Sequence, residues 1–147
     1  MDEIRLPALP DTRDMEVALR NNTLGFAQLF LLRGLYFEGK GDIIRAIDEY
    51  DTAIRINPGN AEVLFIRGLA FGKQGALDQA IANFDDALRI NPAFAEALYA
   101  RGNAWEKKRR FDRAIQDYDA VLRLIPNNSP AANSRENILK QEILELS

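Results

Sequence analysis

The sequence predicts an all-α protein built from repeated helical hairpins, and the spacing of its prolines is the first reason. Asn57-Pro58 recurs as Asn91-Pro92, and Pro126 follows at the same interval. Between these prolines the apolar residues fall at helical spacing, in two runs separated by a turn. A fixed period of about 34 residues is typical of one helical unit repeated along the chain, each copy burying its apolar face against the next.

Small residues at the same interval are a further reason. Glycine and alanine each return three times, at Gly34, Gly68, Gly102 and at Ala46, Ala80, Ala114. A glycine inside a helix costs roughly 1 kcal/mol relative to alanine, so three at one phase indicate that a second backbone or a large ring presses there. We expect the alanines on the facing helix, and Phe37, Phe71 and Trp105 to fill the remaining space.

The period also predicts the helices in order. In the second unit we expect helices over residues 61–74 and 77–90. Gly75 ends the first, because glycine readily adopts the left-handed conformation common just past a helix C-terminus. Asn91-Pro92 ends the second, because the residue before proline disfavours the α region. The same pattern gives three units, which span residues 27–60, 61–94 and 95–128.

The N-terminal residues 1–26 do not follow the period. Pro7 and Pro10 indicate an irregular lead, followed by a short helix near residues 12–20. Asn22 lies in a break that is a candidate helix start. We expect this segment to cap the first unit, with a disordered arm as the alternative.

The C-terminal residues 129–147 predict one capping helix. Ser129 is a plausible N-cap, and Pro130 suits the first helical position. Its apolar face is expected to pack on the third unit. A second interpretation is that this face docks against another copy and gives a homodimer, through Ile138, Leu139, Ile143 and Leu146.

Composition argues against several classes of function. The chain has 147 residues, a net charge of −3 and a pI of about 5.1, whereas phosphate binding needs a basic face. We therefore expect no nucleic-acid partner. Cysteine and histidine are absent, which removes thiolate metal sites, the commonest general base and the commonest metal ligand. We expect no catalytic residues, no metal site and no cofactor.

No targeting or membrane segment is visible. The N-terminus lacks a basic stretch followed by an apolar run, so it does not resemble a signal peptide. The longest apolar stretch, residues 26–37, is interrupted by Gln28, Arg33 and Gly34 and falls short of a membrane span. The sequence predicts a soluble protein, with the cytoplasm as its default location.

The pattern resembles the tetratricopeptide repeat, a helix–turn–helix unit of about 34 residues. The resemblance covers all three units and is carried by the small residues and by Pro58, Pro92 and Pro126. The chain departs from the pattern at Arg109, which stands where Gly41 and Gly75 end the first helices of the earlier units. Either this arginine is left-handed, or the third turn differs.

The resemblance implies a right-handed superhelical solenoid whose first helices line a concave groove. That groove would bind a peptide or helix of a partner protein without catalysis. When the groove positions of the family are transferred to the matching positions of each repeat, the resemblance implies these groove residues: Leu31, Leu35, Glu62, Phe65, Leu69, Lys73, Tyr99, Asn103 and Lys107. Large apolar residues repeated on a solvent face indicate a binding patch. The alternative is that they pack on neighbouring helices or lie under the N-terminal segment.

One known partner of the family can be tested by residue type. Relatives that bind the acidic tail of heat-shock chaperones hold its carboxylates with a Lys/Asn/Lys/Arg clamp. The matching phases here are occupied by Leu31, Leu35, Ile66, Glu96 and Ala100. None of these side chains donates a charge-assisted hydrogen bond, so the sequence argues against a dicarboxylate tail as partner.

Charged residues give two further expectations. Asp51, Asp85 and Asp119 each precede an arginine by four residues, a spacing that favours i,i+4 pairs on the second helices. The basic run 107–110 is expected to complement the negative pole of a helix end. Its alternative role is docking an acidic partner. The sequence therefore predicts a non-catalytic protein-binding module, with structural self-assembly as the alternative.

Overall fold

The computed structural model describes Arg13 and residues 22–147. Seven α-helices and no strands occupy the described residues, which confirms the all-α prediction. The helices are α2 (Thr23–Gly39), α3 (Ile43–Ile56), α4 (Ala61–Lys73), α5 (Leu77–Ile90), α6 (Ala95–Lys107), α7 (Phe111–Leu124) and α8 (Ser129–Leu146). No helix in this part of the chain is long and apolar enough to cross a membrane. The predicted helix near residues 12–20 lies outside the described residues, apart from Arg13.

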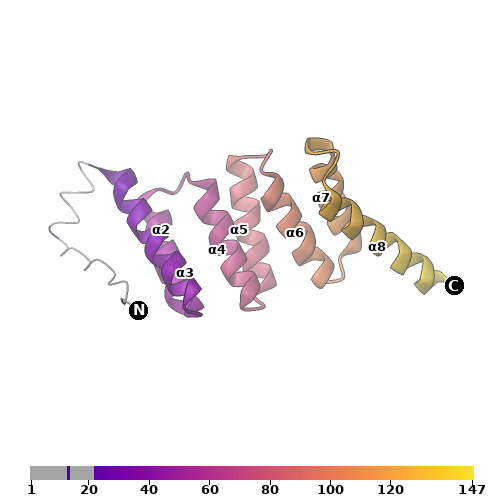
Figure 1. Cartoon of the computed structure of the whole chain (residues 1–147), viewed down its shortest axis with the longest axis horizontal. Coiled ribbons are helices and arrows are strands. Elements are labelled where there is room, and N and C mark those ends of the chain that lie inside the picture. The colour runs from indigo at the N-terminus through magenta and orange to yellow at the C-terminus, as the bar shows by residue number, and fades with distance from the viewer. Residues whose placement is uncertain (1–12, 14–21) are drawn as a thin grey trace.

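The helices pair into three hairpins that stack in one row (Figure 1). The hairpins are α2–α3, α4–α5 and α6–α7, and the second helix of each packs against the first helix of the next. α8 packs on α7 in the same way, so it takes the place of the first helix of a fourth unit. The array is therefore a solenoid in which each unit contacts only its neighbours.

Asparagine side chains cap three of the helices at their N-termini. Asn60 Oδ1 accepts hydrogen bonds from the backbone N–H groups at 62 and 63, and Asn22 does the same for residue 25. These bonds satisfy donors that have no partner inside the helix. The prediction for α8 was wrong by one residue, because Asn128 is its cap and Ser129 is already helical.

The turn inside each hairpin is the same in all three units. Its central residue has a positive φ, +81° at Gly41, +75° at Gly75 and +56° at Arg109. The residue that follows donates a backbone hydrogen bond across the turn, for example from Arg110 N–H to Trp105 O at 2.9 Å. The third turn therefore keeps its shape, and the arginine adopts the left-handed conformation.

An aromatic ring from the second helix presses on each mid-helix glycine. A Cβ atom at Gly68 would lie 2.6 Å from Cε1 of Phe84, and one at Gly102 would lie 2.7 Å from Cε1 of Tyr118. Tyr50 takes the same position against Gly34. The expectation that Phe37, Phe71 and Trp105 fill this space was wrong. Those three rings lie at the edge of the core and are only partly buried.

The alanines on the second helices are buried as expected. Ala46, Ala80 and Ala114 are at most 1% exposed. Together with the glycines they let two helix backbones approach closely, while the ring between them buries a large apolar side chain. Tyr50 and Tyr118 are among the largest fully buried side chains of the described chain.

Arginines join each unit to the one before it. Arg67 Nη1 lies 2.7 Å from Asp51 Oδ1, and Arg101 Nη1 lies 2.8 Å from Asp85 Oδ1. Arg135 on α8 repeats the contact with Asp119 at 2.6 Å. The predicted i,i+4 pairs were therefore wrong at these aspartates, because an arginine on the next unit lies closer than the one on the same helix.

The same arginines also hold the second helix of their own unit. Arg101 Nε and Nη2 donate to Asp117 at 2.9 and 2.7 Å, and Arg67 Nε donates to Asn83 Oδ1 at 2.7 Å. Hydrogen bonds from Arg101 to Asp117 and Asp85 raise the pKa of this guanidinium above its ordinary value against the opposing effect of burial. We call this set the arginine ladder: Arg33, Arg67, Arg101 and Arg135. Each interior rung fixes three helices relative to one another.

The contact between ring and glycine generates a matched test. We expect Gly68→Ala to lower the free energy of unfolding by about 1–3 kcal/mol, since Phe84 is 2% exposed and has no room to retreat. Gly72→Ala on the same helix is the control, because no heavy atom lies within 4 Å of a Cβ atom placed there. We expect the control to gain up to about 1 kcal/mol from helix propensity. Urea unfolding measures both, and equal shifts would contradict the assignment.

Candidate functional site

A groove runs along the first helices of the second and third units. It consists of three neighbouring hollows of about 650, 280 and 370 Å³ that share lining residues. The first and third hollows share Phe65 and Glu96, and the second and third share Leu69 and Asn103. The groove therefore extends along α4 and α6, with the loops at 57–60 and 91–94 at one end.

Seven of the nine predicted groove residues line these hollows. They are Glu62, Phe65, Leu69, Lys73, Tyr99, Asn103 and Lys107. Leu31 and Leu35 of the first unit are not part of the lining. Leu31 is 7% exposed and belongs to the core around Tyr50, so its expected exposure to the groove was wrong.

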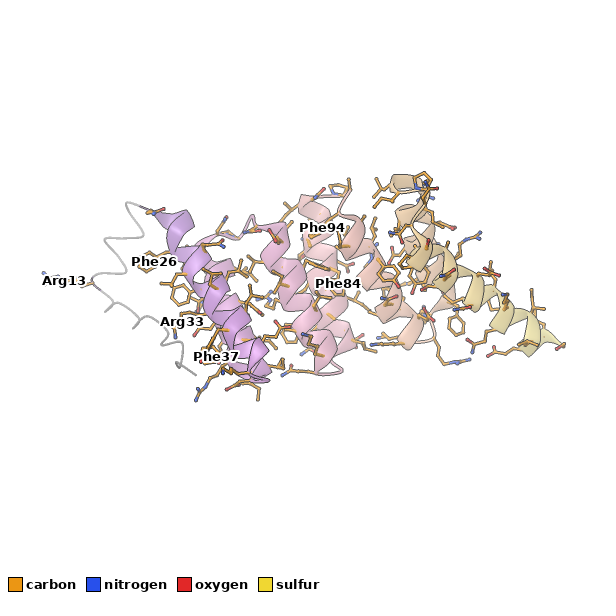
Figure 2. The ribbon with its side chains drawn as sticks, in the orientation of Figure 1. Arg13, Phe26, Arg33, Phe37, Phe84 and Phe94 are labelled. Carbon is orange, nitrogen blue, oxygen red and sulfur yellow. The ribbon has the colours of Figure 1, made fainter. Side chains whose placement is uncertain are left out.

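Two of the aromatic rings that line the groove, Phe65 and Tyr99, are partly covered by other rings. Phe65 packs against Phe84 and Phe94, with ring centroids 5.9 and 4.9 Å apart, and Tyr99 packs against Tyr118 at 5.7 Å. Figure 2 shows Phe84 and Phe94 in the middle of the row. One face of each groove ring therefore belongs to the core and only the other faces the hollow. Leu69 is 38% exposed, and Ile90 and Ile125, which also line the hollows, are 45% and 44% exposed.

Part of the lining was missed in the sequence. Ala100 lines the hollows of about 280 and 370 Å³, and Ile125 and Pro130 line the hollow of about 370 Å³. Pro130 lies one repeat period after Glu96, so the period alone could have identified Pro130 as a groove residue. α8 therefore packs on α7 as a cap and also contributes to the wall of the groove through Pro130.

Charges of opposite sign lie at the two ends of the groove. Glu62 and Glu96 lie in the first turns of α4 and α6, where the helix dipole favours acids. Lys73 and Lys107 lie in the last turns of the same helices. Lys73 forms an ion pair with Glu38 of the first unit. One unit later, Lys107 takes the position of Lys73 but Gly72 takes the position of Glu38, so Lys107 has no carboxylate at this place. Lys107 is thus the more available cation.

Buried tyrosine hydroxyls position the polar floor of the groove. The Tyr118 hydroxyl lies 2.7 Å from both Asn103 Oδ1 and Glu106 Oε2. Burial, followed by the hydrogen bond to Glu106, raises the pKa of Tyr118 above its ordinary value. Tyr50 bonds Glu38 in the same way, and its pKa is raised for the same reasons. Asn103 is thereby held toward the hollow by a neutral partner.

Two residues of the basic run 107–110 bind other side chains of the chain. Lys108 pairs with Asp78, and Arg109 pairs with Glu145 of α8 at 2.9 Å while stacking over Phe111. These contacts occupy two of the four cations within the chain, whereas the helix-end interpretation stays a prediction. Of the residues in this run, only Lys107 lines the hollow of about 280 Å³ that Leu69 also lines.

No chemistry-bearing cluster accompanies the groove. Among the described residues, no three acidic side chains gather closely enough to hold a metal ion. The groove is lined by apolar, amide and charged side chains, and this lining does not pair a nucleophile with a general base. The arrangement suits recognition of another chain.

Comparison with known proteins supports this architecture. Residues 31–93 and 65–129 match the sequence profile described as tetratricopeptide repeat. The first such domain of Spaghetti (RPAP3), solved with the HSP90 peptide SRMEEVD, is 25% identical, with a TM-score of 0.77 over 81% of this chain and 94% of that one. The second domain of human RPAP3, solved with the HSP70 peptide SGPTIEEVD, is 26% identical, with a TM-score of 0.70 over 76% and 97%.

A further solved structure shows the fold alone. The tetratricopeptide domain of Arabidopsis OM64 is 24% identical, with a TM-score of 0.77 over 82% of this chain and 99% of that one. The comparison with curated protein sequences gives no match. The two profile matches overlap and together cover residues 31–129, which is most of the chain. The chain belongs to the tetratricopeptide repeat family.

Proposed function

We propose that this protein is a non-catalytic interaction module that captures a peptide or helix of a partner protein in the groove along α4 and α6. The observation that carries the proposal is the pair of neighbouring, largely apolar hollows that share the exposed Leu69 and lie between two charged ends. Exposed apolar surface of this kind is typical of a binding site. Similarity to domains solved with bound peptides supports the same conclusion.

The partner is proposed to differ from the chaperone tails bound by those relatives. Glu96 and Ala100 line the groove at two of the phases where the family's clamp holds carboxylates. Glu96 repels a carboxylate, and Ala100 donates nothing to it. The apolar centre instead favours a segment that inserts aliphatic or aromatic side chains, in extended or helical form.

Groove capture predicts a specific loss on substitution. Peptides selected from a random display library on the immobilised full-length protein serve as the probe. We expect Leu69→Asn to weaken their binding about tenfold or more, as loss of a buried anchor worth about 1.4 kcal/mol or more does. Fluorescence anisotropy with the selected peptides gives the affinities.

The controls separate the groove from general exposure. Ile44→Asn changes a residue that is 70% exposed on α3 and lies outside the groove lining, so it should leave affinity unchanged. The peptide SRMEEVD should bind more weakly than the selected peptides. If Leu69→Asn and Ile44→Asn bind equally, or if SRMEEVD competes best, the proposal is wrong. Phe65→Ala is less suitable, because that ring also packs on Phe84 and Phe94.

Self-assembly through α8 is the second candidate, and the exposure of its last turns favours it. Ile143, Leu144 and Leu146 are 67%, 73% and 88% exposed. By contrast, Ile138 is buried against the third unit. Burial of the exposed set between two copies would remove apolar area from water.

Light scattering over a concentration series tests this second candidate. If the end of α8 mediates a homodimer, the mean mass rises with concentration, and Ile143→Asp abolishes the rise. Substitution of Ile138 would be uninformative, since it also disturbs the core. A constant monomer mass up to high concentration would eliminate self-assembly while leaving groove capture intact.

A further inference from the structure

The groove along α4 and α6 changes its charge from one end to the other. Glu62 and Glu96 line one hollow at the N-terminal ends of the two helices, and Lys73 and Lys107 line another at the C-terminal ends. The two helices therefore run in the same direction and place like charges together. Leu69 lines both apolar hollows between them. The groove thus has an acidic end, an apolar centre and a basic end.

Three of these four end charges have no partner of opposite sign inside the chain. Glu62, Glu96 and Lys107 are exposed, and none of their side chains forms an ion pair in the part of the chain that the structure describes. Lys73 differs, because its ammonium group already binds Glu38 of the first unit. The groove therefore offers a ligand two carboxylates at one end and one ammonium group at the other.

The helix dipole explains the sign of these charges but not their place. It favours an acid in the first turn and a base in the last turn of any helix. α5 follows this rule with Asp78 and Arg89, and α7 follows it with Asp112 and Arg123. Those four side chains line none of the three hollows of the groove. Only on α4 and α6 do the end charges adjoin exposed apolar surface, where a bound segment would meet all three features at once.

The distance between the two ends sets the length of such a segment. The charged residues lie eleven positions apart on each helix, from 62 to 73 and from 96 to 107. At about 1.5 Å per residue this separation is about 16 Å. An extended segment covers that distance with about five residues, whereas a helical segment needs about eleven.

We propose that the groove selects a bipolar segment, which we define by a lysine or arginine at one end, apolar residues in the centre and an aspartate or glutamate at the other end. This proposal rests on groove capture as the function. The basic residue binds Glu62 and Glu96, the apolar residues fill the hollows at Leu69, and the acidic residue binds Lys107 through charge-assisted hydrogen bonds.

The charges decide orientation and specificity more than affinity. A segment laid the other way would bring its carboxylate against Glu62 and Glu96 and its cation against Lys107. Such like-charge contacts discriminate against the wrong orientation and against segments with a single sign of charge. The affinity itself comes mainly from the apolar centre, because exposed ion pairs contribute little.

Peptide display on three forms of the full-length chain tests the charge pattern. The forms are the wild type, Lys107→Gln and the double variant Glu62→Gln/Glu96→Gln, each immobilised and offered the same random library. We expect peptides selected on the wild type to carry a base and an acid about five or about eleven residues apart, with apolar residues between them. On Lys107→Gln the acid should lose its enrichment while the base keeps it. On the double variant the base should lose its enrichment instead.

Affinities of the peptides selected on the wild type give a second readout. We expect Lys107→Gln and the double variant each to weaken binding about two- to fivefold in fluorescence anisotropy, as loss of an exposed charge pair does. Added salt should weaken wild-type binding more than binding to either variant, since it screens exposed charges. Lys140→Gln and Glu136→Gln are matched controls, because these two residues pair with each other outside the groove lining. Neither control should change affinity.

The outcomes separate this proposal from groove capture itself. If the selected peptides depend on Leu69 but show no paired charges, groove capture stands and the bipolar segment is wrong. If Leu69→Asn leaves their binding unchanged, the groove is not the binding site and both proposals fail. Equal weakening by Lys107→Gln and Lys140→Gln would assign the effect to net charge and overturn the contact at Lys107.

Discussion

The contact of one aromatic ring with one mid-helix glycine sets the geometry of each hairpin. Phe84 on Gly68 and Tyr118 on Gly102 leave no space for a Cβ atom, so the two backbones and the ring fit in only one arrangement. Packing of this kind resists change because protein interiors are close-packed and have few voids. Repeating it once in every unit gives three nearly identical hairpins, and identical hairpins stack into a row.

The arginine ladder then fixes how one hairpin sits on the next. Arg101 binds Asp117 within its unit and Asp85 in the preceding one, which links three helices through one planar group. Asp117 is 7% exposed and Arg101 is 24% exposed, so the geometry of this pair matters more than that of a surface pair, whereas Asp85 is 46% exposed. The stack places α4 and α6 next to each other, and the groove follows from that placement.

The sequence alone predicted the helices of the three hairpins, because they follow the period. The groove assigned from the same period stays a prediction, although seven of its nine residues line the three hollows. The sequence did not predict the ladder, since Asp85 and Arg89 satisfy a local i,i+4 rule that cannot be weighed against Arg101 without the third dimension. It also misplaced Leu31, because the phase that faces the groove in the second and third units lies within the core of the first.

Proton NMR of the three glycines is the most direct test of the central contact. If the rings stack on the glycines, the Hα protons of Gly34, Gly68 and Gly102 shift upfield and show nuclear Overhauser effects to the rings of Tyr50, Phe84 and Tyr118, respectively. Overhauser contacts from those glycines to Phe37, Phe71 and Trp105 instead, or no ring contacts at all, would contradict the account of the hairpin and of the stack that depends on it.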